Sequence, residues 1–199
     1  MRQVVILGAA SVLAGCSGLP SADPVQYDHQ RDMALSPGHP LDRVVAPPGF
    51  ELKDNLRYTE RRRSDRASDA GSIQVNEHLF TWESDSSGDI MGLLQLSIDS
   101  RSEFFPLSNT DGYEFVGGHL VSYWSGWGTL SDMFYDIPSA SSIEHECVFA
   151  THLGVTSSSK RYRSIAGYYE GIPCPDGGAL TSSDYLDQRQ RAYRAFGLQ

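Results

Sequence analysis

Apolar residues recur at every second position in several short runs between residues 73 and 169, a period typical of β-strands. The pattern is clearest at 90–98, where leucine and isoleucine alternate with glutamine and serine. A stretch of aspartate, serine and glycine at 85–89 separates this run from an earlier one at 73–82. Such residues favour turns, so the two runs are predicted to pair as a hairpin.

A second hairpin is predicted nearer the C-terminus, where the run 147–153 and the run 161–169 flank a polar turn at 156–160. Another apolar segment covers 113–124 and is entered and left through glycine-containing turns. These runs predict an α+β domain built on a mainly antiparallel sheet of about five or six strands.

The C-terminal residues follow a helical period instead. Thr181 and Asp184 match a capping box, in which each residue caps the backbone of the other. The apolar side chains that fall on one side of such a helix are Tyr185, Leu186, Ala192, Tyr193 and Phe196. Gly197 can end the helix. We therefore expect one C-terminal helix, and a short additional one near 131–135.

Residues 17–49 lack these periods. They contain six of the ten prolines and few paired apolar residues, a composition typical of a linker. The sequence thus predicts a tether over 16–49 and a single globular domain over 50–199. A flexible tether of this length would place the domain at a mean distance of roughly 30 Å from its origin.

The first sixteen residues have the order of a secretion signal. Arg2 provides a positive charge, residues 4–13 are apolar, and Leu13-Ala14-Gly15-Cys16 follows. This ending resembles the lipobox of bacterial lipoproteins, in which small residues precede the cysteine whose thiol receives a diacylglyceryl group. The resemblance implies a signal peptide at 1–15 and a mature protein that begins with lipidated Cys16, carrying acyl chains such as palmitate.

The same resemblance bears on location. In bacteria with two membranes, an aspartate after the lipidated cysteine favours retention in the inner membrane, whereas this chain has Ser17. The outer membrane is therefore the favoured site of the anchor, with the domain facing the periplasm or the cell surface. No stretch of 18 apolar residues is present, so no transmembrane span is predicted.

The net charge of the chain limits the classes of partner that it can bind. The 199 residues include 16 Lys and Arg against 25 Asp and Glu, for a net charge of −9. Loss of residues 1–15 removes one arginine and no acid, which gives about −10 for the mature chain. Such a surface repels nucleic acid and has no general attraction for anionic lipid. Membrane attachment is accordingly assigned to the acyl chains, and no nucleic-acid partner is expected.

The two remaining cysteines, Cys147 and Cys174, form an even pair in an oxidising compartment. A disulfide between them is expected to stabilise the fold by about 3 to 4 kcal/mol in the chain-entropy model. A metal site or a reactive thiol is the alternative. Neither cysteine belongs to a C-x-x-C pair, and the nearby histidines lack zinc-finger spacing, so no metal or cofactor is assigned.

Catalytic motifs are weak. Ser157 and Lys160 match S-x-x-K, but they lie in a predicted turn and the partner motifs of penicillin-recognising enzymes are absent. His145 lies between two glutamates, yet on a strand it points away from both. The motifs of serine hydrolases, zinc peptidases, P-loop nucleotide-binding proteins and EF-hands are missing. No catalytic residue is assigned, and the sequence leaves enzymatic activity open while favouring a binding protein.

Two clusters are candidate docking residues. An arginine cluster lies on an otherwise acidic chain, and could bind an acidic partner or lipid phosphates or simply be solvated. A dense aromatic group could form part of the core, stack on sugar rings or receive a partner. The candidates are Arg61, Arg62, Arg63, Tyr123, Trp124 and Trp127.

The sequence therefore predicts a lipid-anchored envelope protein that acts as a binding or docking module for another envelope component, either a protein or cell-wall material. Two alternatives stay open: a periplasmic hydrolase with a dispersed active site, and a lipoprotein that binds a small ligand or sugar.

Overall fold

Ten strands and one helix make up the part of the chain that the computed structural model describes, residues 25–63, 72–98, 103–129, 143, 145–175 and 180–198. The three N-terminal strands are β1 (Gln26–Asp28), β2 (Met33–Leu35) and β3 (Arg43–Val45). The others are β4 (Phe50–Arg63), β5 (Ser72–Ser84), β6 (Ile90–Ile98), β7 (Gly112–Val116), β8 (His119–Thr129), β9 (Cys147–Thr156) and β10 (Tyr162–Ile172). Helix α2 covers Ser182–Ala195.

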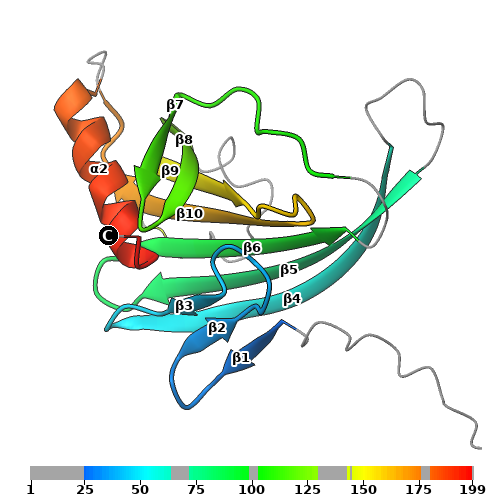
Figure 1. Ribbon diagram of the computed structural model, residues 1–199. Helices are drawn as coiled ribbons and strands as arrows, with labels where there is room; N and C mark the ends of the chain where they lie inside the picture. Colours follow the sequence, from blue (N-terminus) through cyan, green and yellow to red (C-terminus); the bar gives the residue numbers. More distant parts are fainter. Residues whose placement is uncertain are drawn as a thin grey trace, which may run out of the picture.

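The strands form two antiparallel sheets. β1, β2 and β3 pair in that order, and the larger sheet has the order β4-β5-β6-β10-β9-β8-β7. The large sheet is strongly curved, and the small sheet and α2 lie beside it (Figure 1). The predicted α+β class and antiparallel sheet are confirmed, as are the hairpins β5-β6 and β9-β10.

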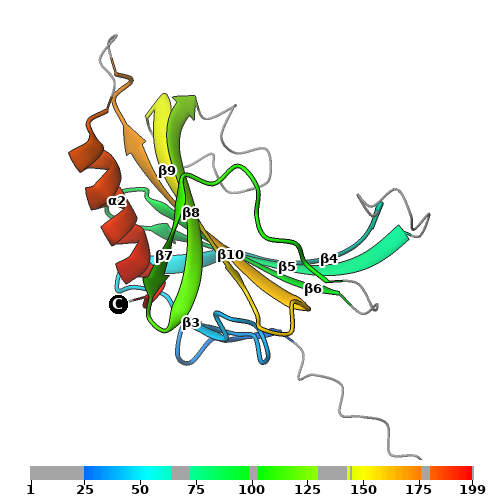
Figure 2. The ribbon, with the colours of Figure 1, turned by 45° about the horizontal axis from the view of Figure 1, so that its top comes forward.

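The expected five or six strands were too few, since the sheets have seven and three. The apolar segment at 113–124 is a hairpin of its own, because Gly117 and Gly118 turn the chain between β7 and β8. β4 was not predicted as one strand. Asp54 interrupts the alternation of its apolar residues, and a bulge between Leu52 and Asp54 shifts the register there. Figure 2 shows the β4-β5 hairpin extending beyond the end of β6.

The predicted start of the folded domain at Phe50 was also wrong. Residues 25–49, here called the N-terminal sheet, fold against the large sheet in place of the expected tether. Their buried apolar side chains include Ala34, Leu41 and Val44. These residues are scattered among prolines and strands of three residues, so no local period indicates them. Only eight residues, 17–24, lie between Cys16 and Val25.

The core lies on the face of the large sheet that the N-terminal sheet and α2 cover, which we call the inner face. Phe80 and Trp82 of β5 and Leu153 of β9 are fully buried there, together with Tyr193 of α2. The opposite face, called the outer face, has a smaller buried cluster that includes Ile90, Val148 and Tyr169. Adjacent residues of each strand alternate between these faces.

Helix α2 begins as predicted. The Thr181 hydroxyl accepts a hydrogen bond from the backbone N–H of Asp184, and the Asp184 carboxylate accepts one from the backbone N–H of Thr181. Hydrogen bonds from the Thr181 hydroxyl and, to a smaller extent, from its backbone N–H lower the pKa of the Asp184 carboxylate. Gly197 follows the helix with φ of 69°, a left-handed conformation that glycine adopts without strain. The short helix expected near 131–135 lies outside the described residues.

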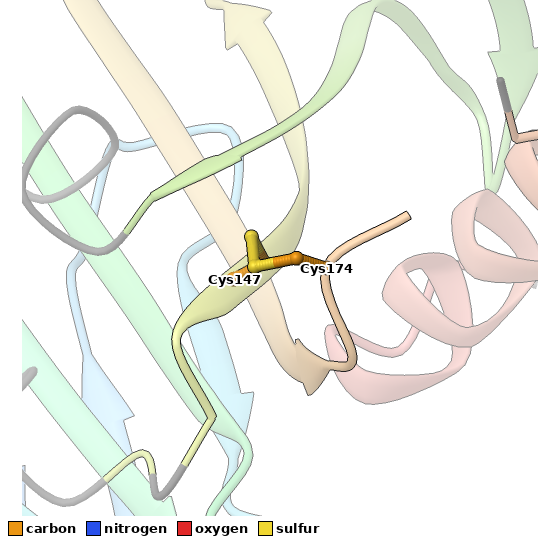
Figure 3. Close-up of a disulfide and its surroundings, with 2 residues drawn as sticks. All are labelled: Cys147 and Cys174. Carbon is orange, nitrogen blue, oxygen red and sulfur yellow. A yellow bond between two sulfur atoms is a disulfide. The ribbon is translucent and has the colours of Figure 1, made fainter. Parts of the chain in front are cut away.

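The predicted disulfide is present. Cys147, at the start of β9, is bonded to Cys174, two residues beyond the end of β10, with 5.1 Å between the Cα atoms (Figure 3). The bond fixes the end of β10 from which the chain continues to α2. None of the helices in the described part of the chain is both long and apolar enough to cross a bilayer.

Candidate functional site

The hairpin of β7 and β8 forms one margin of the large sheet. Its two-residue turn uses Gly117 and Gly118, with φ of 56° and 82°. Positive φ at both turn positions is the geometry that matches the twist of paired strands, and it favours glycine. The sequence therefore fixes the register of this hairpin, in which Phe115 lies opposite Leu120 and Tyr113 opposite Ser122.

That register places three large apolar side chains together on the outer face. Tyr113 is 53% exposed, Phe115 75% and Leu120 62%. We call these three residues the hairpin patch. Phe115 and Leu120 are direct cross-strand neighbours, and Tyr113 is two residues from Phe115 on the same side of β7. Neighbouring large apolar side chains with this exposure are a recognised feature of interaction surfaces.

The hairpin is anchored from its other face. Glu114 points inward and accepts a hydrogen bond from the Tyr193 hydroxyl of α2, with a 2.7 Å separation of the oxygens. Burial and this carboxylate raise the pKa of Tyr193. The Glu114 carboxylate also lies 3.6 Å from Nε of Arg189. Val121, opposite Glu114, is fully buried. The helix therefore holds the hairpin in place while the outer side chains remain exposed.

The Tyr113 hydroxyl is held as well. It donates a hydrogen bond of 2.9 Å to the carbonyl of Leu107, in the segment that leads into β7. The ring is thus oriented by its hydroxyl while more than half of the residue stays exposed. An aromatic side chain fixed in this way loses little conformational entropy when a partner covers it.

The predicted aromatic group does not form a single surface. Tyr123, Trp124 and Trp127 all lie on β8, and strand alternation sends Trp124 to the opposite face from the other two. Arg189 of α2 lies over the Tyr123 ring at 4.0 Å from its centroid. Trp127 is 39% exposed. Phe134 and Tyr135, the next aromatic residues along the chain, lie outside the described residues.

Trp124 stacks on His152 of β9, with ring centroids 5.0 Å apart and nearly parallel planes. His152 also makes an edge-to-face contact with the Tyr169 ring, and the Tyr169 hydroxyl lies 3.1 Å from Nε2 of His152. Burial lowers the pKa of His152 to about 4, so the ring is neutral at pH 7. The Tyr169 ring reaches this position over Gly167, where a Cβ would collide with it. These contacts indicate a packing role.

The arginine cluster lies at the far end of an edge strand. Arg61, Arg62 and Arg63 are the last residues of β4 and lie opposite the first residues of β5. Arg57, on the same strand, donates a hydrogen bond to the carbonyl of Val25. β4 and the aromatic strand β8 belong to opposite halves of the large sheet, so the two predicted docking clusters are separate.

A polar cavity of about 360 Å³ lies at the turn between β5 and β6. Its lining consists of the turn itself, including Glu83 and Asp85, and of His145 from the segment before β9. The serine hydroxyls of the turn bond to one another and to nearby backbone, for example Ser84 to the N–H of Ser87. Carboxylates and hydroxyls of this kind suit a small polar ligand.

The remaining sequence candidates are placed as follows. Cys16 lies outside the described residues. Ser157 and Lys160 occupy the turn between β9 and β10, where Lys160 pairs with Glu103 at 3.1 Å. Among the described residues, no three His, Cys, Asp or Glu side chains come together as a metal site would need.

The hairpin patch was missed because its apolar side chains resemble core residues in the sequence. Tyr113, Phe115 and Leu120 sit in a segment that reads as one buried strand. The turn signal Gly117-Gly118 was the available clue, since it splits the segment and sets its register. No protein-family model, curated protein or solved structure matches this chain.

Proposed function

We propose that this protein is a lipid-anchored lipoprotein of the cell envelope, held in the outer membrane, and that it docks another envelope protein on the hairpin patch. The observation that carries the proposal is the exposure of three neighbouring apolar side chains on a rigidly held hairpin. Covering a large apolar side chain contributes about 1.5 to 3 kcal/mol to association. Phe115 is 75% exposed, so covering it would contribute the most of the three side chains.

The hairpin patch could contact either a protein or the membrane that holds the anchor. The position of the proposed anchor favours the protein. Val25, where the described fold begins, belongs to the N-terminal sheet on the inner face. The hairpin patch lies on the outer face, at the other margin of the large sheet. The nine Cα-to-Cα steps from Cys16 to Val25 reach at most about 30 Å. An anchor this short favours an orientation with the inner-face side near the bilayer and the patch turned away from it.

Charge favours a basic partner over a second copy of the chain. Two mature chains would each bring a charge of about −10, which opposes their association. The segment 111–120 has no lysine or arginine, and of its two acidic residues Asp111 and Glu114 only Glu114 faces inward to α2. A partner with basic residues around an apolar centre would complement this margin. The arginines at the end of β4 are proposed as a separate contact with acidic groups.

Photo-crosslinking in living cells tests the docking site. A photoreactive amino acid at position 115 or 120 is expected to yield one predominant adduct with another envelope protein. The same residue at Gln190, exposed on α2, serves as the matched control and should not yield that adduct. Phe115→Ser combined with Leu120→Ser should abolish the adduct formed by a probe at position 113. Equal adducts from position 190 would contradict docking at the patch.

The folded state of these variants has its own control. Because the patch side chains are exposed, Phe115→Ser should change the free energy of unfolding by less than about 0.5 kcal/mol. Val121→Ala, on the buried face of the same hairpin, should destabilise the protein by at least about 1 kcal/mol. Urea unfolding of both variants separates loss of docking from loss of fold.

Anchoring is tested separately. Cys16→Ala should abolish incorporation of radiolabelled palmitate and release the protein from the membrane fraction. Retention of the label in the Cys16→Ala variant would refute the lipoprotein assignment and leave the docking experiment unaffected.

The polar cavity supports binding of a small polar ligand as a second candidate. Its carboxylates Glu83 and Asp85 would bind amines or sugar hydroxyls. Calorimetric titration with glucosamine, which offers both groups, tests this candidate. Heat of binding that disappears in Asp85→Asn would support it, and the absence of heat at millimolar glucosamine would count against it.

A further inference from the structure

Two buried histidines lie where the N-terminal sheet meets the large sheet. His39, in the turn between β2 and β3, is 7% exposed, and His78 of β5 is 5% exposed. The large sheet contributes His78, whereas the N-terminal sheet contributes His39. The charge of each ring therefore affects the contact between the two sheets.

Both rings are packed as neutral groups. His78 stacks on Phe80 with 4.4 Å between ring centroids, and its Nε2 is hydrogen-bonded to Oδ1 of Asn55. His39 packs against Tyr162 of β10 at 4.9 Å. Nδ1 of His39 is buried without a hydrogen-bond partner within the described residues. A proton added there would place a buried charge among poorly compensating groups.

The neighbouring charge is positive. Arg57 of β4 donates to the carbonyl of Val25, so its guanidinium lies at the same interface. Burial, together with the smaller effects of the charges of Arg57 and His39, lowers the pKa of His78 to about 4. Burial also lowers the pKa of His39, against an opposing effect of the carbonyls of Ser36, Pro37 and Leu96.

Among the described residues, the groups that shift the pKa of the two imidazoles are neutral or positively charged. No carboxylate of the described residues contributes to the pKa shift of either histidine. The strands β6 and β10 face the interface with neutral groups. The Gln95 side-chain amide donates a hydrogen bond of 2.7 Å to the carbonyl of Leu41, and the Ser164 hydroxyl accepts one of 3.1 Å from the N–H of Leu41. Protonation of both imidazoles would thus bring three positive charges together at this interface.

We infer that the N-terminal sheet is an acid-released clasp: protonation of His39 and His78 beside Arg57 detaches residues 25–49 from the inner face while the large sheet stays folded. The attached state takes up protons less readily than the detached state, so attachment is strong near pH 7. It weakens as the pH falls from about 6.5 toward about 4.

The two sheets differ in what holds them. The N-terminal sheet has strands of three residues, and many of its buried apolar side chains are small, such as Ala34, Val44 and Ala46. The large sheet is held by ladders of up to thirteen residue pairs and by the Cys147–Cys174 disulfide, none of which involves residues 25–49. Local opening of the weaker unit is therefore the expected response to charge at the interface.

Release of the N-terminal sheet would expose side chains of the inner face. Phe80 and Trp82, which pack against Tyr27 of β1, would lose that cover. If the proposed anchor at Cys16 holds, the chain between the lipid and the folded part would also lengthen from eight residues (17–24) to 33 residues (17–49). The mean reach of a flexible chain would then roughly double. Release itself does not depend on the anchor or on the hairpin patch.

Hydrogen exchange of the full chain at pH 7.5 and pH 4.5 tests the clasp, with rates corrected for the intrinsic effect of pH. Protection of amides in β2 and β3 should fall at least tenfold at pH 4.5, relative to amides in β9 and β10. The double variant His39→Gln, His78→Gln should show less than a threefold change. His119→Gln, which removes a histidine from the β7-β8 hairpin at the opposite margin of the large sheet from β4, should behave like the unmodified chain.

A second measurement covers the case in which the double variant has already lost the N-terminal sheet at pH 7.5. The imidazole titrations of His39 and His78, followed by NMR in the unmodified chain, should share a midpoint with the loss of protection. Release without such titration would overturn the inference. Equal loss of protection in both sheets would also overturn it, because that result means global unfolding.

Discussion

His152 illustrates how one residue stabilises the outer face of the sheet. It lies between Trp124 and Tyr169, and burial lowers its pKa from 6.5 to about 4. The unfolded chain therefore binds a proton between these two pH values while the folded chain does not. Stability from the neutral ring is fully present above about pH 6.5 and is lost as the pH falls toward 4.

His152→Phe should remove this part of the pH dependence, because phenylalanine keeps a planar apolar ring against Trp124. Between pH 7 and pH 4.5 the unmodified chain should lose about 2 kcal/mol more unfolding free energy than the variant. Urea denaturation at the two pH values measures the difference. Parallel losses in both proteins would show that His152 does not titrate in this range.

At the scale of elements, α2 is joined to the sheet by a buried polar side chain as well as by apolar packing. Gln188 is fully buried, and its side-chain amide donates a hydrogen bond of 2.6 Å to the carbonyl of Phe149. Its carbonyl accepts a hydrogen bond from the Thr151 hydroxyl. A glutamine on a helix normally faces solvent, so this contact fixes which side of α2 meets β9.

Gln188→Ala should destabilise the protein by about 1 to 3 kcal/mol, since it leaves the Phe149 carbonyl and the Thr151 hydroxyl without these partners. Gln190→Ala, on the exposed side of the same helix, should change the unfolding free energy by less than about 0.5 kcal/mol. Chemical denaturation of the pair provides the comparison. Similar values for both would mean that the buried amide contributes little.

The disulfide acts on the same element pair. Cys147→Ser combined with Cys174→Ser should lower the unfolding free energy by about 3 to 4 kcal/mol, because the unfolded chain is no longer closed into a loop. A thiol titration of the denatured, unreduced protein should find neither Cys147 nor Cys174 free. Two reactive thiols in addition to any at Cys16 would be incompatible with the bond.

At the scale of the whole molecule, residues 25–49 belong to the folded unit. The N-terminal sheet contributes Ala34, Leu41 and Val44 to the same core as Phe80 and Trp82 of the large sheet. The inner face therefore has two covers, one from each end of the described chain: the N-terminal sheet and α2. This arrangement makes residues 25–49 part of the domain and shortens the proposed tether.

Truncation tests this boundary. A chain that starts at Val25 should unfold cooperatively, with a midpoint close to that of the mature chain. A chain that starts at Phe50 should have a lower midpoint and bind an apolar dye, because Phe80 and Trp82 lose the N-terminal sheet that covers them. Differential scanning calorimetry and dye fluorescence compare the two. Identical behaviour would mean that the N-terminal sheet adds no stability at neutral pH.

The sequence by itself determined the features that depend on neighbours in the chain. Alternation gave the hairpins β5-β6 and β9-β10, and the Thr181 and Asp184 capping box gave the start of α2. The pairing of Cys147 with Cys174 followed from the small number of cysteines. The lipobox resemblance at Cys16 is local in the same sense and stays a prediction.

The tertiary structure decided which side chains are covered. The sequence of residues 17–49 indicates a linker, yet residues 25–49 pack on the inner face because a curved sheet formed much later in the chain offers an apolar surface. Phe115 and Leu120 resemble core residues in sequence, yet they are exposed because no described element covers the outer face of their hairpin. Burial depends on contacts between distant segments, and alternation reports only which residues share a face.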